Sequence, residues 1–344
     1  MQSRAGRTLA KPRLGFLGVG WIGRKRMEAI AQSGYAEITA IADPASALLR
    51  EAACLAPEAA VCPSLSELLK QALDGIVIAT PSALHPEQAC LAIEQGMPVF
   101  CQKPLGRNLA ENARVIETAR AHDKLLGVDL SYRFIDEVRA VTDLVRNGEL
   151  GEVYAVDITF HNAYGPDKPW FYDPKLSGGG CVIDLGIHLV DLVLWTFGFP
   201  NVNAVTSRLF AQGKPLISPE TQVEDYAVAR IDLENGAAVQ LACSWKLHAG
   251  CDAIISGAFY GTKGGAQFRN VNGSFVDFIA ERYSGTRTER LSACQSGWGG
   301  RAAVHWARRL SEGRKFDPEI ENLLRVAEVL DAIYGRSQES RPRA

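Results

Sequence analysis

An aspartate and a histidine, Asp184 and His188, stand four residues apart in a long apolar segment that follows three glycines, 178–180. On an α-helix this spacing would place both side chains on one face. A carboxylate beside an imidazole can orient the ring and tune it for proton transfer near neutral pH. A buried polar pair that only satisfies itself would show the same pattern. The pair is therefore a candidate catalytic site whose interpretation depends on the rest of the chain.

A glycine-rich turn near the start of the chain has the sequence Gly18-Val19-Gly20-Trp21-Ile22-Gly23. It follows an apolar run of strand length, 14–17, and precedes a segment, 22–32, for which we expect a helix. A second expected strand, 37–42, ends at Asp43, twenty residues after the last glycine of the turn. A strand, this glycine spacing, a helix and a following acid together form the fingerprint of a dinucleotide-binding unit.

The residue types of the turn indicate how it would hold such a ligand. Glycine permits the tight turn and the close approach of a pyrophosphate, whose charge the free N–H groups of Trp21 and Ile22 would attract. Asp43 would accept hydrogen bonds from the ribose hydroxyls and repel a 2′-phosphate, so we expect NAD, with NADP less favoured. The basic residues 24–26 could pair with a phosphate, but we interpret them as a solvated face of the helix.

Length and composition indicate a globular protein of two domains. The chain has 344 residues, 47 % of them hydrophobic, and a formal net charge of −2, which gives no electrostatic case for binding nucleic acid. The longest apolar runs have the size of strands, so we expect no membrane span. Residues 1–10 lack the apolar core of a signal peptide and are expected to form a tail.

The cysteines indicate a reducing environment rather than a metal site or a disulfide framework. None of the eight belongs to a CxxC pair or to a metal-ligand spacing, and several lie in apolar segments, where a thiol behaves as a small hydrophobe. We therefore expect no metal, reduced thiols and a cytoplasmic location. The eight positions are 54, 62, 90, 101, 181, 243, 251 and 294.

Strands and helices alternate from residue 12 to about residue 133, which predicts a parallel, doubly wound sheet, a Rossmann domain of the α/β class. Ligands bind beyond the carboxyl ends of such strands. Three expected strand ends carry polar or functional pairs, at Thr80-Pro81, Gln102-Lys103 and Tyr132-Arg133. The expected strands are 74–80, 98–102 and 125–130, and the helices between them are 85–95 and 109–122.

Lys103 is the most informative residue at these strand ends. Because proline follows, its backbone is extended, which would present the side chain to the crevice; the Lys103–Pro104 bond could be trans or cis. A lysine beside a cofactor that becomes cationic on oxidation should have a lowered pKa and could polarise a substrate oxygen. A surface lysine at a turn is the plainer interpretation. His85, at the start of a helix, could equally serve only as its cap.

Successive strands without intervening helices predict an α+β domain with a large open, mostly antiparallel sheet after residue 133. We place the domains at 11–133 and 134–335, with flexible tails at 1–10 and 336–344, and the last helix could pack back on the first domain. The aromatic loop 163–177, which includes Trp170, suits stacking on a sugar ring, although its aromatics could equally anchor the loop itself. The expected strands are 151–160, 202–210, 224–233, 237–247, 253–260, 264–271 and 274–281, and the helices are 136–147, 184–197, 301–312 and 318–334.

The chain resembles the glucose–fructose oxidoreductase / inositol dehydrogenase / MocA (Gfo/Idh/MocA) family over nearly its whole length. The motifs that carry the resemblance are Gly18–Gly23, Ala42-Asp43-Pro44, Thr80-Pro81-Ser82-Ala83-Leu84-His85, Gln102-Lys103-Pro104 and Gly178–His188.

The resemblance implies an NAD(P)-dependent oxidoreductase acting on a sugar, a sugar derivative or a cyclitol. Lys103 would lie at the reaction centre, His188 would transfer the proton and Asp184 would bind substrate hydroxyls. The other implied contacts are Thr80, Pro81, Ser82, His85, Gln102 and Lys103 itself for the cofactor, and Tyr132, Arg133 and Trp170 for the substrate.

One position departs from the family pattern. Gln102 stands where the family usually has glutamate, which removes a charge beside Lys103 and could lower the pKa of that lysine further.

The resemblance also implies homodimers or homotetramers assembled through the open face of the second sheet, and it leaves two other functions open. A relative that has lost catalysis would be an NAD-binding regulator. A glycosidase that uses NAD for a transient oxidation would release an aglycone without net cofactor turnover. Retention of Lys103, Asp184 and His188 together favours the dehydrogenase.

Overall fold

The computed structural model describes residues 11–291 and 299–336. The expected tails at 1–10 and 337–344, and Cys294, lie outside these described residues. Arg336, expected in the second tail, is instead part of the structure, because its guanidinium donates to the carbonyl oxygen of Gly178 at 2.8 Å.

The first half of the chain forms a six-stranded parallel sheet in the order β3-β2-β1-β4-β5-β6. This order starts from the centre and winds outward in both directions, as a right-handed series of strand–helix–strand units requires. The α/β expectation is therefore confirmed, with α2, β3 and α3 as additional elements. The bounds are β1 Arg13–Leu17, α1 Trp21–Ser33, β2 Glu37–Ala42, α2 Ser46–Ala53, β3 Ala60–Cys62, α3 Leu65–Leu68, β4 Gly75–Ile78, α4 His85–Glu94, β5 Val99–Cys101, α5 Leu109–Ala121 and β6 Leu126–Val128.

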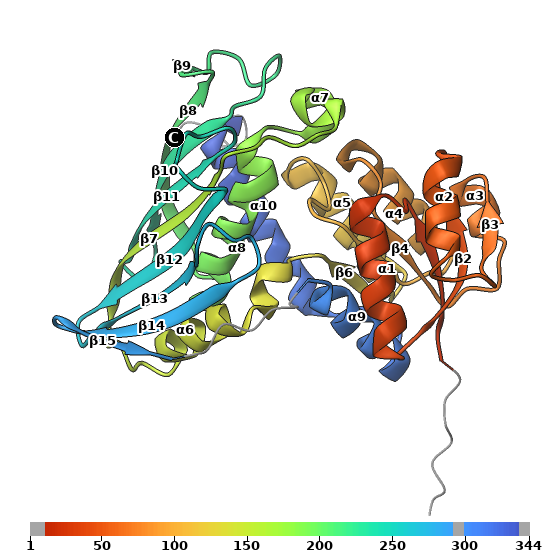
Figure 1. Cartoon of the computed structure of the whole chain (residues 1–344), viewed down its shortest axis with the longest axis horizontal. Coiled ribbons are helices and arrows are strands. Elements are labelled where there is room, and N and C mark those ends of the chain that lie inside the picture. Colours follow the sequence, from red (N-terminus) through yellow and green to blue (C-terminus); the bar gives the residue numbers. More distant parts are fainter. Residues whose placement is uncertain (1–10, 292–298, 337–344) are drawn as a thin grey trace, which may run out of the picture.

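The second half forms a nine-stranded sheet in the order β15-β14-β13-β12-β7-β11-β10-β8-β9. Only the β7–β11 pair is parallel, so the expected mostly antiparallel sheet is confirmed. In Figure 1, α6, α8 and α10 lie against one face of the sheet, and no helix of the described residues covers the other. The bounds are α6 Asp136–Arg146, β7 Val153–Asn162, α7 Pro174–Ser177, α8 Ile187–Thr196, β8 Val202–Ala211, β9 Lys214–Pro215, β10 Tyr226–Leu233, β11 Ala238–Ser244, β12 Ala253–Gly261, β13 Gly265–Asn270, β14 Phe278–Ser284, β15 Arg287–Arg290 and α10 Asn322–Ile333.

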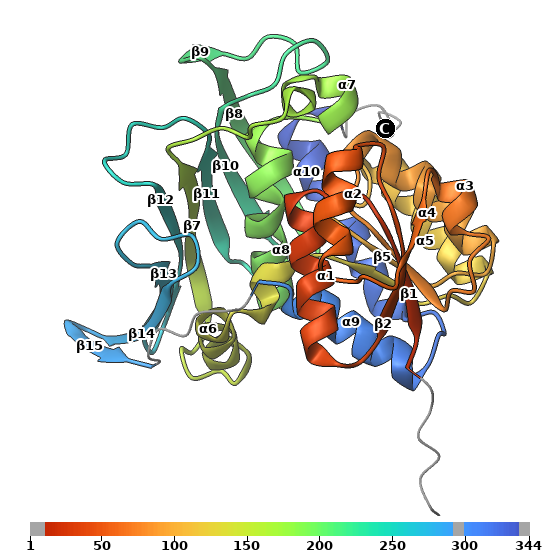
Figure 2. The ribbon, with the colours of Figure 1, turned by 45° about the vertical axis from the view of Figure 1, so that its right-hand side comes forward.

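One helix of the expected second domain belongs to the core of the first. Helix α9, Arg301–Glu312, lies beside α1 in Figures 1 and 2 and buries Trp306 against the parallel sheet. The Trp306 ring lies 5.7 Å from that of Phe100. A Cβ at Gly127 would lie 2.6 Å from the indole, so glycine leaves the space that the ring fills. The expected domain boundary at residue 133 therefore separates the two sheets but assigns α9 to the wrong half. Helix α10 packs between the halves, against α5 of the first and α8 of the second.

The segment Pro174–Thr196 has 23 residues, and its most apolar 18-residue window has a mean hydropathy of 1.5, enough in length and composition to cross a membrane. The expectation that no segment reaches this size is therefore wrong. Within the fold, 89 % of its most apolar window is buried by the rest of the protein. Its apolar residues form the central layer between the second sheet and the first half, as in a core helix.

Candidate active site

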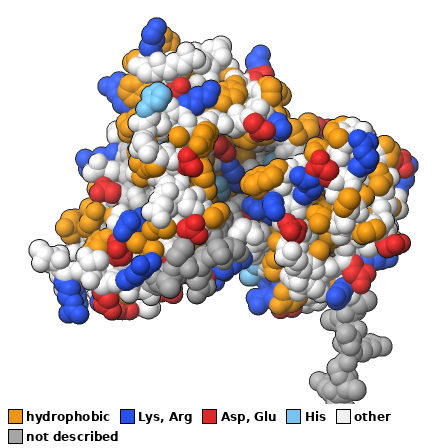
Figure 3. All heavy atoms as spheres, viewed as in Figure 1, with side chains coloured by type: hydrophobic (Ala, Val, Ile, Leu, Met, Phe, Trp, Pro, Cys, Tyr) orange, Lys and Arg blue, Asp and Glu red, His pale blue; other side chains and the backbone are white. Residues whose placement is uncertain are grey.

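A cavity of about 820 Å³ lies at the carboxyl ends of the parallel strands, between the two halves of the chain. Figure 3 shows the molecule hollowed between these halves, with acidic and basic side chains interspersed over this face. Residues from several separate segments meet in the cavity, although they lie far apart in the sequence. They include the turn Gly18, Gly20, Trp21 and Ile22, then Asp43, then Thr80, Pro81, Ser82, His85, Gln102 and Lys103, and finally Pro166, Asp167, Lys168, Trp170, Phe171 and Asp184.

The glycine turn leaves the N-terminus of α1 open toward this cavity. Gly18 has φ of +84°, and a Cβ there would lie 2.6 Å from the carbonyl oxygen of Ala79, so the tight turn requires glycine. At Gly20 a Cβ would meet no described atom within 4 Å, which leaves a free cradle. No side chain of the described residues caps α1. Free N–H groups and the helix dipole therefore face a space that suits a pyrophosphate.

Asp43 lies at the end of β2, where the fingerprint predicts it. Its carboxylate accepts hydrogen bonds from the backbone N–H groups of Val19 at 3.0 Å and Ala45 at 2.8 Å. These two bonds fix the negative charge at the rim of the cavity, with further lone pairs available to a ribose.

The basic residues 24–26 do not provide a phosphate site. Arg24 pairs with Glu51 and Lys25 with Glu28 on the exposed side of α1. Arg26 was expected in the solvated face but is buried, because its guanidinium pairs with the fully buried Asp129 after β6. All three cations are thus neutralised by carboxylates, which supports NAD rather than NADP.

His85 supports the lysine turn instead of offering a polar group to a ligand. Its Nε2 lies 2.7 Å from the carbonyl oxygen of Thr80, and its Nδ1 lies 2.7 Å from that of Pro104, which follows a cis peptide bond. The ring is 1 % exposed, and burial lowers the pKa of His85. Both ring nitrogens of His85 already face carbonyl oxygens of the protein. Its expected role in cofactor binding is therefore limited to lining the cavity.

Lys103 and Asp184 form the central polar contact of the cavity. The Lys103 ammonium donates to Asp184 Oδ1 and to the backbone carbonyl oxygen of Asp184, both at 2.6 Å. A second donor, the indole Nε1 of Trp245, reaches the other carboxylate oxygen at 3.0 Å. The side chains of Lys103 and Asp184 are only 14 % and 19 % exposed, so solvent screens their attraction weakly.

The segment that carries Asp184 is not the regular helix that the sequence predicted. Residues Val182–Gly186 form a π-helical turn that leads into α8. Single π-turns within α-helices are rare and occur frequently at functional sites. Among the described residues, Asp184 makes no hydrogen bond to His188, because its carboxylate is directed to Lys103 and Trp245.

His188 is a buried imidazole next to the charged pair. Its ring packs at 4.7 Å from that of Tyr132, and its Nδ1 is buried without a hydrogen-bond partner among the described residues. Burial, followed by the positive charges of Lys103 and Arg26, holds the pKa of His188 well below its usual range. The ring is therefore neutral near pH 7 and can accept a proton.

Tyr132 and Arg133, for which we expected contacts with the substrate, do not line the cavity. Tyr132 is buried against the rings of Phe160 and His188, and it does not line the cavity. Arg133 forms an ion pair with the buried Asp191 and lies over the ring of Phe199. Both residues pack against α8, through Asp191 and His188. Their side chains are therefore used in contacts within the protein and do not reach the cavity.

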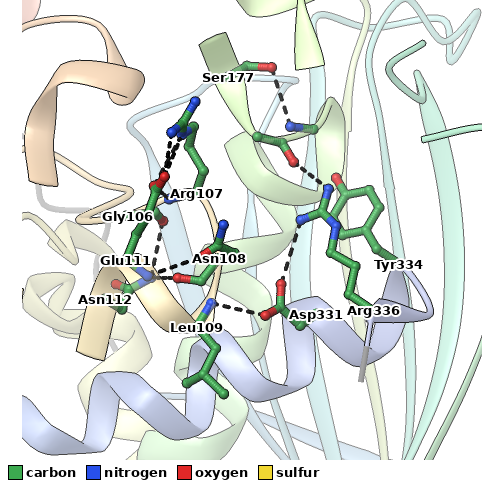
Figure 4. Close-up of polar contacts among 12 residues, drawn as sticks. Gly106, Arg107, Asn108, Leu109, Glu111, Asn112, Ser177, Asp331, Tyr334 and Arg336 are labelled. Carbon is green, nitrogen blue, oxygen red and sulfur yellow. Dashed lines mark hydrogen bonds and ion pairs between the residues drawn. The ribbon is translucent and has the colours of Figure 1, made fainter. Parts of the chain in front are cut away.

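The three glycines before Asp184 are held between α5 and α10. Figure 4 shows Arg336 donating to the carbonyl of residue 178, and Ser177 Oγ accepting from the N–H of Gly179 at 3.3 Å. Arg336 also pairs with Asp331, whose Oδ2 accepts from the N–H of Leu109 at the start of α5 at 2.9 Å. This network ties the turn to both halves of the molecule.

A buried glutamate completes this support. Glu224 is fully buried, and its carboxylate accepts hydrogen bonds from the N–H groups of Gly180 and Val182 and from the hydroxyl of Tyr334, at 2.7–3.0 Å. A carboxylate at this position satisfies free N–H groups at the start of the π-turn. Burial nevertheless raises the pKa of Glu224.

Comparison with known families and proteins decides the identity of the fold. The model of the oxidoreductase family with an NAD-binding Rossmann fold matches residues 13–130, and the Gfo/Idh/MocA C-terminal domain matches residues 138–267. The chain belongs to the Gfo/Idh/MocA oxidoreductases. The predicted resemblance is thereby confirmed, and with it an NAD(P)-binding oxidoreductase.

Individual members of the Gfo/Idh/MocA family are similar to this chain at 20–31 % sequence identity. The chain is 31 % identical over 203 residues to D-glucoside 3-dehydrogenase of Escherichia coli K12, covering 56 % of this chain and 58 % of that relative. It is 30 % identical over 251 residues to inositol 2-dehydrogenase of Leifsonia xyli subsp. xyli, covering 72 % and 70 %. Levoglucosan dehydrogenase, solved with NADH and levoglucosan, superimposes with a TM-score of 0.81 at 20 % identity, covering 96 % and 98 %. That last likeness shows the shared fold.

Gln102 is the position where this chain departs from the Gfo/Idh/MocA pattern. Its side chain lines the cavity beside Lys103, and its Oε1 is buried without a partner among the described residues. A buried oxygen without a donor is costly. A free acceptor at this place fits a ligand that supplies an N–H or O–H group, as a bound dinucleotide does.

Substitution Glu224→Ala is expected to destabilise the fold by about 3 kcal/mol, because three donors would lose their buried acceptor. Urea-induced unfolding followed by circular dichroism measures this change. Tyr334→Phe is the matched control, since it removes one of the same hydrogen bonds and should cost about 1 kcal/mol. Equal stability of the two variants would contradict the role assigned to Glu224.

Proposed function

We propose that this protein is an NAD-dependent dehydrogenase that interconverts a secondary alcohol and a ketone on a sugar, a sugar derivative or a cyclitol. The observation that carries the proposal is the Lys103–Asp184 pair, which lies where the dinucleotide cradle meets the loop of the second half. The named activities of the relatives, a glucoside 3-dehydrogenase and an inositol 2-dehydrogenase, support the substrate class.

Lys103 is suited to bind the reacting oxygen. An ammonium group has three N–H donors, and Asp184 occupies two of them, so the third is available to a substrate hydroxyl. As this oxygen loses its proton, the positive charge of Lys103 stabilises the developing alkoxide in a poorly solvated space. Bound NAD supplies the site that accepts the hydride.

His188 is the candidate acceptor of the hydroxyl proton. Its imidazole does not line the cavity itself, but it follows Asp184 by four residues on the same helical segment, and burial keeps it neutral near pH 7. Asp184 holds Lys103 in place and can accept a hydrogen bond from a neighbouring substrate hydroxyl with its remaining lone pairs. In this arrangement His188 accepts the proton of the substrate hydroxyl, and Lys103 stabilises the negative charge that develops on the same oxygen.

The aromatic loop supports a carbohydrate as the substrate. Trp170 stacks on Phe171 with ring centroids 3.8 Å apart, and both line the cavity. Aromatic faces provide apolar area with fixed geometry, which suits the C–H face of a sugar or cyclitol ring. Phe171 also packs against Trp245, so the aromatic residues of the loop anchor it as well.

Incubation of the protein with NAD and a panel of glycosides, aldoses and cyclitols tests the proposal. Appearance of NADH absorbance together with a ketone product is the expected result. Aglycone release with unchanged cofactor would instead identify an NAD-dependent glycosidase. Tight NAD binding without turnover of any panel member, in either direction, would identify a regulator.

The cofactor preference provides a separate prediction. NAD should bind more tightly than NADP, and Asp43→Ala should narrow the ratio of the two Kd values by about 10-fold, equivalent to about 1.4 kcal/mol, because it removes a charge that repels a 2′-phosphate. Fluorescence titration with each cofactor measures both Kd values. Asp43→Asn keeps an acceptor for the ribose and removes only the charge, so it should narrow the ratio with less loss of NAD affinity. Equal affinities in the unchanged protein would contradict this role of Asp43.

We also propose that the protein forms homodimers or homotetramers and works in the cytoplasm. The uncovered face of the nine-stranded sheet presents Thr206, Arg208, Arg230 and Gln240, which a second copy could cover. The cysteines of the described residues are free thiols, as a reducing compartment favours. Light scattering coupled to gel filtration measures the assembly, and a monomer at all concentrations would overturn it.

A further inference from the structure

We propose that Trp245 is a positioning residue that couples the substrate loop, residues 163–177, to the Lys103–Asp184 pair. The inference rests on the proposed function for its kinetic consequence, but the contacts that carry it can be tested without a substrate. Trp245 has no signal in the sequence and belongs to none of the motifs of the resemblance.

The indole of Trp245 holds the oxygen of Asp184 that Lys103 does not use. Its Nε1 donates to Asp184 Oδ2 at 3.0 Å, while Lys103 donates to Oδ1 at 2.6 Å. The carboxylate is therefore attached at both oxygens, by one donor from each half of the molecule. Removal of the indole N–H would leave the carboxylate free to rotate and would loosen the ammonium that it orients.

The backbone fixes Trp245 in this place. It follows directly after β11, and its N–H donates to the carbonyl oxygen of Asp225 at 2.7 Å. The side chain is 2 % exposed. A donor so restrained can hold a carboxylate in one orientation, which a mobile surface side chain could not do.

The other side of the same ring packs against the substrate loop. Phe171 contacts it edge-on at 6.3 Å and 85°, and Tyr172 at 5.7 Å and 63°. Tyr172 is held in turn by Lys246, whose Nζ lies 4.7 Å from the ring centre, and it donates its hydroxyl to the carbonyl of Pro166 at 3.0 Å. Loop residues Pro166 and Phe171 line the cavity that also contains Asp184.

Because Trp245 contacts both the loop and Asp184, the conformation of the loop and the orientation of the Lys103–Asp184 pair depend on the position of one ring. A substrate that fits the loop leaves the indole in contact with Asp184, and the Lys103 ammonium then keeps its orientation. A substrate that displaces Phe171 or Tyr172 would move the indole and disturb the pair. Trp245 would thus convert the fit at the loop into a difference in kcat, which an apolar wall alone cannot do.

The hydrogen bond itself can be followed by NMR of protein labelled with ¹⁵N-tryptophan. The indole N–H signal of Trp245 is identified by its loss in Trp245→Phe. Substitution Asp184→Ala should shift this signal upfield and speed its exchange with solvent, and Phe171→Leu should shift it by a smaller amount. Asp43→Ala, at the opposite end of the cavity, should leave it in place. An unchanged signal in Asp184→Ala would overturn the proposal whether or not any substrate is turned over.

Kinetics then test the positioning role. Trp245→Phe keeps a ring and removes the donor, so kcat should fall about 10- to 100-fold, as for the loss of a hydrogen bond to a charged group, with KM changed less than threefold. Trp306→Phe is the matched control. This tryptophan is also buried, but its Nε1 has no partner among the described residues and it packs on the first sheet, so kcat should stay near the wild-type value.

The double variant separates positioning from general loss of structure. If Trp245 acts through Asp184, then Trp245→Phe should cause no further loss of kcat in an Asp184→Ala background. Additive losses would overturn the proposal. NAD affinity serves as the check on folding, and Trp245→Leu, which also lacks a donor, replaces Trp245→Phe if that variant binds NAD abnormally.

Discussion

The variant Lys103→Met is expected to lose at least about 10²- to 10³-fold in kcat, the cost of removing one donor from a developing oxyanion. Methionine retains the length and the apolar stem of lysine, but it cannot donate to Asp184 or to a substrate oxygen. The charge contributes most when the alkoxide forms, so kcat and kcat/KM should fall together. Steady-state kinetics with the substrate found in the panel measures both constants.

Two controls accompany this variant. Lys25→Met removes an exposed lysine whose ion pair among the described residues is with Glu28 on α1, so its kcat should equal that of the wild type. Fluorescence titration should show that Lys103→Met still binds NAD with a Kd close to the wild-type value. Turnover of Lys103→Met near the wild-type rate would mean that the Lys103–Asp184 pair is structural.

Substitution His188→Ala is expected to lower kcat by about 10²- to 10⁴-fold, the usual contribution of a general base. The ring is 6 % exposed and packs on Tyr132, so His188→Gln, which fills more of the same space without a comparable base, should lose a similar factor. Equal activity of His188→Gln and the wild type would exclude His188 as the base.

The pH profile of kcat/KM gives His188 a second test. The imidazole must be neutral to accept a proton, and burial with Lys103 and Arg26 keeps the pKa of His188 well below 6.5. Activity should therefore persist as the pH falls through 6.5 and decline only below it. Lys103→Met removes one of these positive charges, which raises the pKa of His188, so the acid limb measured on its residual activity should move to higher pH. A shift to lower pH would contradict the electrostatic contact between the two residues.

Local patterns in the sequence sufficed to predict most of the fold. The glycine turn and Asp43 depend on backbone conformation and on spacing within one strand–helix–strand unit, and the structure places them as predicted. Alternation of strands and turns likewise predicted the second sheet. The packing of α9 on the first sheet could not be predicted, because it depends on a contact between Trp306 and residues about 180–230 positions earlier.

The predicted site was less accurate where side chains choose partners from distant segments. Regular helical spacing suggested an Asp184–His188 pair, but the π-turn and two donors from other elements directed the carboxylate elsewhere. Arg133 was expected at the ligand, and the buried Asp191 binds it instead. An acid in an apolar strand, such as Asp129, does signal a hidden partner, since buried carboxylates are rarely unpaired; its partner, Arg26, was misread as solvated.

The packing of α9 has a consequence for the order in which this protein is made. Synthesis on the ribosome delivers the six parallel strands before the second sheet, whereas the helix that buries Phe100 and the surface around Gly127 follows only after all nine strands of the second sheet. Until then, the nascent first half exposes an apolar surface that α9 later covers, while the whole second half is produced. The apolar surface of the first sheet that α9 covers therefore stays open until the second sheet has been synthesised.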